Sequence, residues 1–158
     1  MSENNKPILI RTEGLEKIFS LKGGAKLHAV DGIDLEIVQG QTLGVVGESG
    51  CGKSTLGRSI LRLIEPTGGK VFYDGKDITK VKGHEMRELR RNMQIIFQDP
   101  YASIDPRKSV IEAIAEYMLI QKTYKTKRET FNRAAELMDF VGLARRYANS
   151  YPHELDGG

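Results

Sequence analysis

Cysteine, tryptophan and long hydrophobic runs are scarce or missing in this sequence. Among its 158 residues there is a single cysteine, Cys51, which excludes a framework of internal disulfides and favours a reducing compartment. No run of about 18 apolar residues occurs, so no membrane-spanning helix is expected. Residues 1–7 are polar, so no secretory signal is expected either. A chain of this length can bury a core without disulfide or metal support.

Charge of one sign is also in small excess. The 24 basic and 21 acidic residues leave a net charge of +3, which is too balanced to indicate a nucleic-acid partner. The basic residues Arg87, Arg90 and Arg91 and those of residues 122–128 are expected on solvated helix faces. With 39% hydrophobic and 28% charged residues, the composition predicts a soluble globular protein.

Apolar periodicity and glycine positions predict strands in the N-terminal part and helices after them. The strands are expected over residues 8–13, 33–38, 43–46, 71–73 and 93–97. The helices are expected over residues 54–64, 84–92, 110–120 and 127–141. The runs at 43–46 and 93–97 are typical of buried strands, the first of a parallel sheet, and Asp74-Gly75 is typical of a tight turn. A sheet domain with a helical attachment follows, with its boundary near residues 99–106.

A glycine-rich stretch between a predicted strand and a predicted helix matches the Walker A pattern of phosphate-binding loops. Its residues are Gly47, Glu48, Ser49, Gly50, Cys51, Gly52, Lys53 and Ser54, followed by Thr55. Glycines let successive N–H groups turn inward around phosphate oxygens, and the following helix adds its positive end. We expect Lys53 to reach the β- and γ-phosphates, Ser54 to bind Mg²⁺ and Thr55 to donate to the α-phosphate. The sequence therefore predicts a nucleotide site.

Cys51 within this loop admits two interpretations. A thiol near a helix N-terminus is acidified and reactive, whereas a small residue at a variable loop position needs no function. The second interpretation is favoured, because redox regulation requires more than one exposed thiol.

Three further stretches narrow the class of phosphate-loop protein. An apolar strand is predicted to end within residues 93–100, residues 98–107 are QDPYASIDPR, and residues 151–158 are YPHELDGG. These stretches resemble the Q-loop and the beginning of the signature motif of ABC-type ATPases. Residues 29–32 (AVDG) and 61–67 (LRLIEPT) make the chain similar to the ATP-binding subunits of oligopeptide and dipeptide importers, over nearly its whole length.

The resemblance implies an α/β fold, a P-loop NTPase of ABC type with an incomplete parallel sheet, an antiparallel β-subdomain and a helical subdomain. Residues 1–100 would form the nucleotide-binding core with the β-subdomain, and residues 101–158 the helical subdomain. It also implies ATP and Mg²⁺ as ligands, adenine stacking on Phe19, Val30 near the ribose and base, and Gln98 beside Mg²⁺ and the attacking water. The alternatives are a strand-end core residue for Phe19 and a strand-capping amide for Gln98.

The end of the sequence departs from the family pattern. Asp156 replaces the serine of the signature motif, where it either repels the γ-phosphate or turns away as a helix N-cap. The sequence stops at Gly158, and no Walker B strand, catalytic glutamate or switch histidine follows. We therefore expect nucleotide binding without efficient hydrolysis, because phosphoryl transfer depends on these parts together. An unpaired phosphate-loop strand is also expected to cause self-association or a partly disordered core.

The leading hypothesis is an ATP-binding subunit of a peptide-importing ABC transporter, partnered by membrane permease subunits and a second ATP-binding subunit. Such a protein would be cytoplasmic and peripheral at the inner face of the cell membrane, and this chain would be a truncated part of it. A non-catalytic fragment that binds a partner is the alternative, and a soluble ABC-type ATPase of repair or translation is a third hypothesis. Nucleotide binding that depends on Lys53 distinguishes the first hypothesis from the second.

Overall fold

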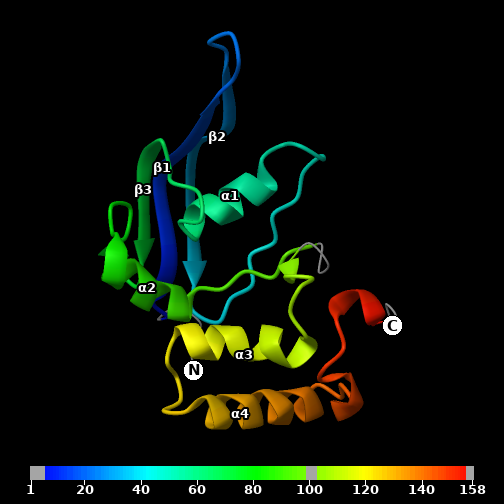
Figure 1. Cartoon of the computed structure of the whole chain (residues 1–158). Helices are drawn as coiled ribbons and strands as arrows, with labels where there is room; N and C mark the ends of the chain where they lie inside the picture. Colours follow the sequence, from blue (N-terminus) through cyan, green and yellow to red (C-terminus); the bar gives the residue numbers. More distant parts are fainter. Residues whose placement is uncertain (1–5, 99–102, 156–158) are drawn as a thin grey trace. The chain divides into compact units, whose positions relative to one another are not determined.

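The computed structural model describes residues 6–98 and 103–155 of the chain (Figure 1). The chain divides into two compact units, Met1–Ile95 and Ile96–Gly158, and each is described by itself. The first unit contains every strand that the structure describes, and the second contains only helices.

The first unit is built on a four-stranded antiparallel sheet. Its strands are β1 (Ile8–Ser20), β2 (Lys26–Val38), β3 (Gly68–Tyr73) and β4 (Lys76–Asp77), in the spatial order β2-β1-β3-β4. Figure 1 shows β1 and β2 as the long strands, with the shorter β3 beside β1. The strands predicted over 8–13, 33–38 and 71–73 are confirmed, and the first two are longer than predicted because they pair along their length as a hairpin.

Two exposed turns connect these strands. Residues 21–25 join β1 to β2 and are exposed. The β3–β4 turn passes through Asp74 and Gly75, whose φ angles of 48° and 74° lie in the left-handed region that a two-residue hairpin turn requires. The predicted tight turn is therefore confirmed.

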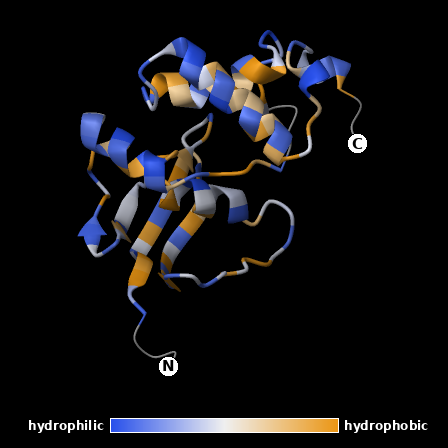
Figure 2. Ribbon diagram, turned by 90° about the horizontal axis from the view of Figure 1, so that it is seen from below, coloured by the Kyte–Doolittle hydropathy of each residue, from blue (hydrophilic) through white to orange (hydrophobic). Residues whose placement is uncertain are grey.

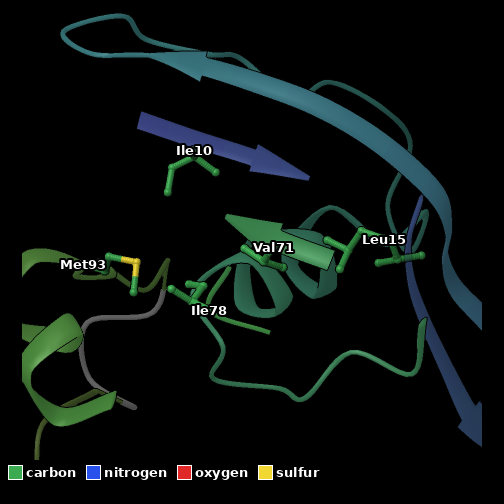
Figure 3. Close-up of a cluster of buried hydrophobic side chains, with 6 residues drawn as sticks. Ile10, Leu15, Val71, Ile78 and Met93 are labelled. Carbon is green, nitrogen blue, oxygen red and sulfur yellow. The ribbon is translucent and has the colours of Figure 1, made fainter. Parts of the chain in front are cut away.

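Buried aliphatic side chains from strands and connections form the core of the first unit. Figure 3 shows Ile10 and Leu15 from β1, Val71 from β3, and Ile78 and Met93 from outside the strands gathered in one cluster. Helix α1 (Lys53–Ile60) contacts β1 and β2, and its Leu56 and Ile60 pack against this cluster. Hydrophobic and hydrophilic residues alternate along the strands (Figure 2), as a sheet with one buried face requires.

Two predicted strands are absent, and this corrects the sequence-based expectation of a parallel sheet. Residues 43–46 have no regular structure, and Val46 is 97% exposed. Residues 93–97 are also irregular, with Met93 buried but Ile96 97% exposed. A strand needs a neighbour to bond its N–H and C=O groups. Among residues 6–98 and 103–155 all strand pairing is antiparallel, and none involves either segment.

Helix α1 ends four residues before the predicted end at residue 64. The backbone N–H of Arg62 bonds the carbonyl of Ser59, and that of Leu63 bonds the carbonyl of Arg58, which closes the helix in a Schellman motif. The next predicted helix is confirmed as α2 (Gly83–Asn92), which places Met86 in the interior.

The second unit is a helical hairpin followed by short 3₁₀ turns. Helices α3 (Val110–Ile120) and α4 (Lys127–Phe140) confirm the two predicted helices, and η3 (Arg145–Tyr147) and η4 (Pro152–Glu154) follow. Ala115 and Met118 of α3 pack with Ala134 of α4 in a buried cluster, as the helical spacing predicted. Ser109 with Glu112 and Thr126 with Glu129 cap the two N-termini. No helix of the described ranges is long and apolar enough to cross a membrane.

A pair of glycines tests how tightly β3 approaches β1. Both Gly69 and Gly75 have positive φ, but only at Gly69 would a Cβ atom meet backbone, at 2.1 Å from the carbonyl oxygen of Gly14. We expect Gly75→Ala to lower the free energy of unfolding by about 1–2 kcal/mol through φ alone. Gly69→Ala should cost at least about 1 kcal/mol more, because β1 must also move. Urea unfolding measures both, and equal losses would contradict the close approach.

Acid should weaken the cap of α3. Hydrogen bonds from the backbone N–H and hydroxyl of Ser109 lower the pKa of Glu112 below its ordinary value of 4.5. The contribution of Glu112 to stability is therefore full above about pH 4.5 and is lost as the pH falls through the lower, folded-state pKa. Because glutamine also closes a capping box, Glu112→Gln should fold at neutral pH and lose less stability on acidification. Thermal unfolding across this pH range would contradict the cap's role if both proteins lost stability in parallel.

Candidate functional site

The phosphate loop, residues 47–54, leads directly into α1. Gly50 and Gly52 have φ angles of 83° and 97°, a conformation that glycine adopts without steric cost. The helix begins at Lys53, and no side chain caps it at Gly52. The first N–H groups of a helix have no partner within the helix. The amides at the start of α1 therefore have no side-chain cap and can bond an anion, and phosphate binding by residues 47–54 stays a prediction.

Lys53 folds back over this loop. Its Nζ atom donates to the carbonyl oxygens of Gly47 at 2.8 Å and Glu48 at 2.5 Å, and lies 3.6 Å from the Sγ atom of Cys51. The ammonium group is thus held by neutral carbonyl oxygens. A phosphate oxygen carries a full negative charge and forms the stronger, charge-assisted bond. A phosphate oxygen can therefore replace the carbonyl oxygens as the hydrogen-bond acceptor of the Lys53 ammonium group.

At two glycines of the loop a Cβ atom would meet a neighbouring atom, and only Gly52 also has a positive φ. A Cβ atom at Gly47 would lie 2.7 Å from the Sγ atom of Cys51. At Gly52 it would lie 2.0 Å from the carbonyl oxygen of Ala29 in β2. The carbonyl group of Ala29 thus sets the distance between the loop and the sheet. Sequence reasoning missed this contribution, because a backbone contact leaves no signature in the identity of the contacting residue.

The remaining loop residues supply polar groups at the surface. Glu48, Ser49, Cys51 and Ser54 are exposed and Thr55 is half-buried. The hydroxyl oxygen of Ser54, on the first turn of α1, is a hard donor of the kind that Mg²⁺ accepts beside nucleotide phosphates. No group of three or more His, Cys, Asp or Glu side chains that could hold a metal ion occurs among residues 6–98 and 103–155. A Mg²⁺ ion would fit here only together with the phosphate groups.

The predicted residues outside the loop occupy different environments. Val30 is 4% exposed and belongs to the hydrophobic core. Phe19 is half-buried near the end of β1, and the ammonium group of Lys17 lies 5.0 Å from its ring centroid. Gln98 is exposed and belongs to the second unit. Ribose contact by Val30, adenine stacking by Phe19 and phosphate sensing by Gln98 stay predictions, and Asp156 lies outside the described residues.

Comparison with known proteins gives this loop a family context. The family described as "ABC transporter" matches residues 30–158. The oligopeptide transport ATP-binding protein OppF of Bacillus subtilis is 48% identical over 151 residues, which cover 95% of this chain and 49% of that protein. OppF of Salmonella typhimurium is 42% identical, covering 97% of this chain and 48% of that protein. The chain spans about half the length of these curated relatives.

A solved structure shares the fold as well. The dimeric ATP-binding cassette MJ0796, solved in a post-hydrolysis state with ADP and Pi, superposes with a TM-score of 0.78 at 26% identity, covering 94% of this chain and 64% of that one. The α/β fold class and the cassette architecture expected from the resemblance are thereby confirmed, apart from the unformed parallel strands. With its phosphate loop in place and the family matched from residue 30 to residue 158, this chain belongs to the ABC transporter family, as an ATP-binding domain.

Proposed function

We propose that this chain binds ATP with Mg²⁺ through the phosphate loop, as part of the ATP-binding subunit of a peptide-importing ABC transporter. The proposal rests on the loop itself. The ammonium group of Lys53 donates to the carbonyl oxygens of Gly47 and Glu48, and the start of α1 has no side-chain cap. The named activities of the OppF relatives and the ADP in the MJ0796 structure support the same function.

Each residue of the loop has a separate part in binding. Gly50 and Gly52 orient amides toward phosphate oxygens, and the positive end of α1 adds to the attraction. Lys53 exchanges its bonds to loop carbonyls for bonds to the β- and γ-phosphates, while Ser54 supplies a hydroxyl oxygen for the cation. Bound Mg²⁺ supplies neutralisation of phosphate charge. Thr55, one residue further along α1, donates to the α-phosphate.

For the chain by itself we propose binding without efficient hydrolysis. Phosphoryl transfer requires a held metal ion and a residue that orients water, acting together. Among the described residues no metal-holding group of acidic, histidine or cysteine side chains is gathered. In the whole protein, ATP binding and hydrolysis would be coupled to transport through membrane permease subunits and a second ATP-binding subunit, at the inner face of the cell membrane. The dimeric MJ0796 cassette supports pairing of such subunits.

A non-catalytic fragment that binds a partner is the second candidate. One observation favours it: residues 43–46 expose Leu43, Val45 and Val46 without pairing to any described strand. Apolar segments with free backbone groups invite association with another chain. The two candidates differ in whether the loop binds nucleotide.

Calorimetric titration with Mg-ATP tests the first candidate. We expect saturable binding that Lys53→Ala weakens at least about tenfold, because a charge-assisted contact to phosphate is lost. Lys125→Ala, which removes an exposed lysine of the second unit, is the control and should bind as the unaltered chain does. Equal affinities of the Lys53→Ala and Lys125→Ala variants would overturn the proposal, and an absence of binding in all three would favour the second candidate.

Light scattering tests the exposed apolar segment. We expect the chain to show a mass above that of one copy, and Val46→Asp to shift it toward one copy because a charge opposes apolar association. Leu21→Asp, which changes an exposed apolar residue of the hairpin loop, should leave the mass unaltered. A monomeric mass for the unaltered chain would contradict self-association through this segment.

A further inference from the structure

A second polar cavity lies in the first unit, and it shares no lining residue with the phosphate loop. It encloses about 360 Å³ beside the connection between α1 and β3 and the segment that follows β4. Its charged and hydroxyl-bearing lining residues are Arg62, Glu65, Thr67, Thr79, Lys80 and Lys82. Three cationic side chains therefore face one carboxylate, which leaves an excess of positive charge around the cavity.

Arg62 is the unusual member of this lining. It is only 5% exposed, and its φ of 53° puts it in the left-handed position that closes the Schellman motif of α1. Glycine is the common residue there, because a Cβ atom makes this conformation unfavourable. An arginine at this position thus combines an unfavourable backbone conformation with the burial of a charge.

The guanidinium group of Arg62 is incompletely satisfied. Its Nη1 atom donates to the carbonyl oxygen of Ile78, and Nη2 lies 3.8 Å from a carboxylate oxygen of Glu65, whose side chain is 71% exposed. Its Nε atom is buried and has no hydrogen-bond partner among the described residues. A buried charge with an unmet donor and a solvent-screened counterion is costly unless an anion approaches it.

The other lining groups complement Arg62. Neither Lys80 nor Lys82 forms an ion pair within residues 6–98 and 103–155. The hydroxyl oxygens of Thr67 and Thr79 accept the backbone N–H groups of Ile18 and Val71 at 3.0 and 2.9 Å. The hydroxyl group of Thr67 keeps its own hydrogen available to donate, whereas the hydroxyl group of Thr79 donates to the carboxylate of Asp77.

Two further carboxylates lie near this lining. Asp77 accepts the backbone N–H of Thr79 at 2.8 Å. The carboxylate of Glu16 lies beside Gly68, 2.6 Å from where a Cβ atom of that residue would be. Neither residue lines the cavity, and Glu65 is the only carboxylate among the lining residues named above. Hydrogen bonds from Thr79 and, to a smaller extent, the charges of Lys70 and Lys80 lower the pKa of Asp77, so Asp77 also competes for Lys80.

We propose that this cavity binds a small soluble phosphate group, independently of the phosphate loop. Arginine matches the oxygens of phosphate with several donors, and lysines add charge without fixed geometry. The hydroxyl group of Thr67 provides a neutral donor. The three cations of the lining exceed its one carboxylate, and the lining keeps an excess of positive charge for an anion although Asp77 offsets part of the charge of Lys80.

An NMR titration with inorganic phosphate tests this site. The titration uses the Lys53→Ala variant to weaken the phosphate loop, and sodium chloride at the same ionic strength as the salt control. We expect saturable shifts of the Gly69 amide, which borders the cavity, that are separate in affinity from any shifts of the Gly50 and Gly52 amides. Shifts confined to Gly50 and Gly52, or shifts of Gly69 reproduced by sodium chloride, would overturn the proposal.

Charge-matched double variants separate a site from general attraction. Lys80→Ala with Lys82→Ala should weaken the phosphate response of Gly69 at least about tenfold. Lys22→Ala with Lys26→Ala removes the same charge from exposed positions around the hairpin loop and should leave the response unaltered. Both double variants alter exposed lysines and keep Arg62, so folding should be retained. Equal responses in the two double variants would show that Arg62 serves only to hold the end of α1, and the proposal would fail.

Discussion

The approach of Gly52 to the carbonyl group of Ala29 is the contact that the nucleotide site depends on. It holds the start of α1 against β2 at a distance that leaves no room for a Cβ atom. Leu56 and Ile60 on the same helix then pack against the core of the sheet. Backbone and core contacts together therefore fix where the helix begins and where the phosphate loop meets the sheet.

The main charged group of the phosphate loop is the ammonium group of Lys53, which can exchange its hydrogen-bond partners. The ammonium group of Lys53 is retained near the loop by two carbonyl oxygens, so the side chain does not extend into solvent. Neutral acceptors hold it more weakly than phosphate oxygens would. The hydrogen bonding of Lys53 differs from that of Arg62. Lys53 donates to carbonyl oxygens of its own loop without a ligand. Arg62 has a buried Nε donor with no partner among the described residues.

The segments at 43–46 and 93–97 illustrate the difference between strand propensity and strand formation. Both have the apolar residues expected of buried strands, and neither pairs with a described strand. The antiparallel sheet forms because β1 and β2 are joined by a five-residue loop and need no distant partner. Parallel pairing requires a partner from elsewhere in the chain, so its outcome depends on neighbours and cannot be predicted from the segment alone.

Local patterns in the sequence determined most of the helices and strands and the position of the phosphate loop before α1. The turn at Asp74-Gly75, the capped helices α3 and α4, and the loop from Gly47 to Ser54 depend on backbone conformations and hydrogen bonds within a few residues. The tertiary structure alone decided that Val30 is buried in the core and that residues 43–46 and 93–97 do not pair with a described strand. Both outcomes depend on contacts between residues far apart in sequence, which a local pattern of residue types does not encode.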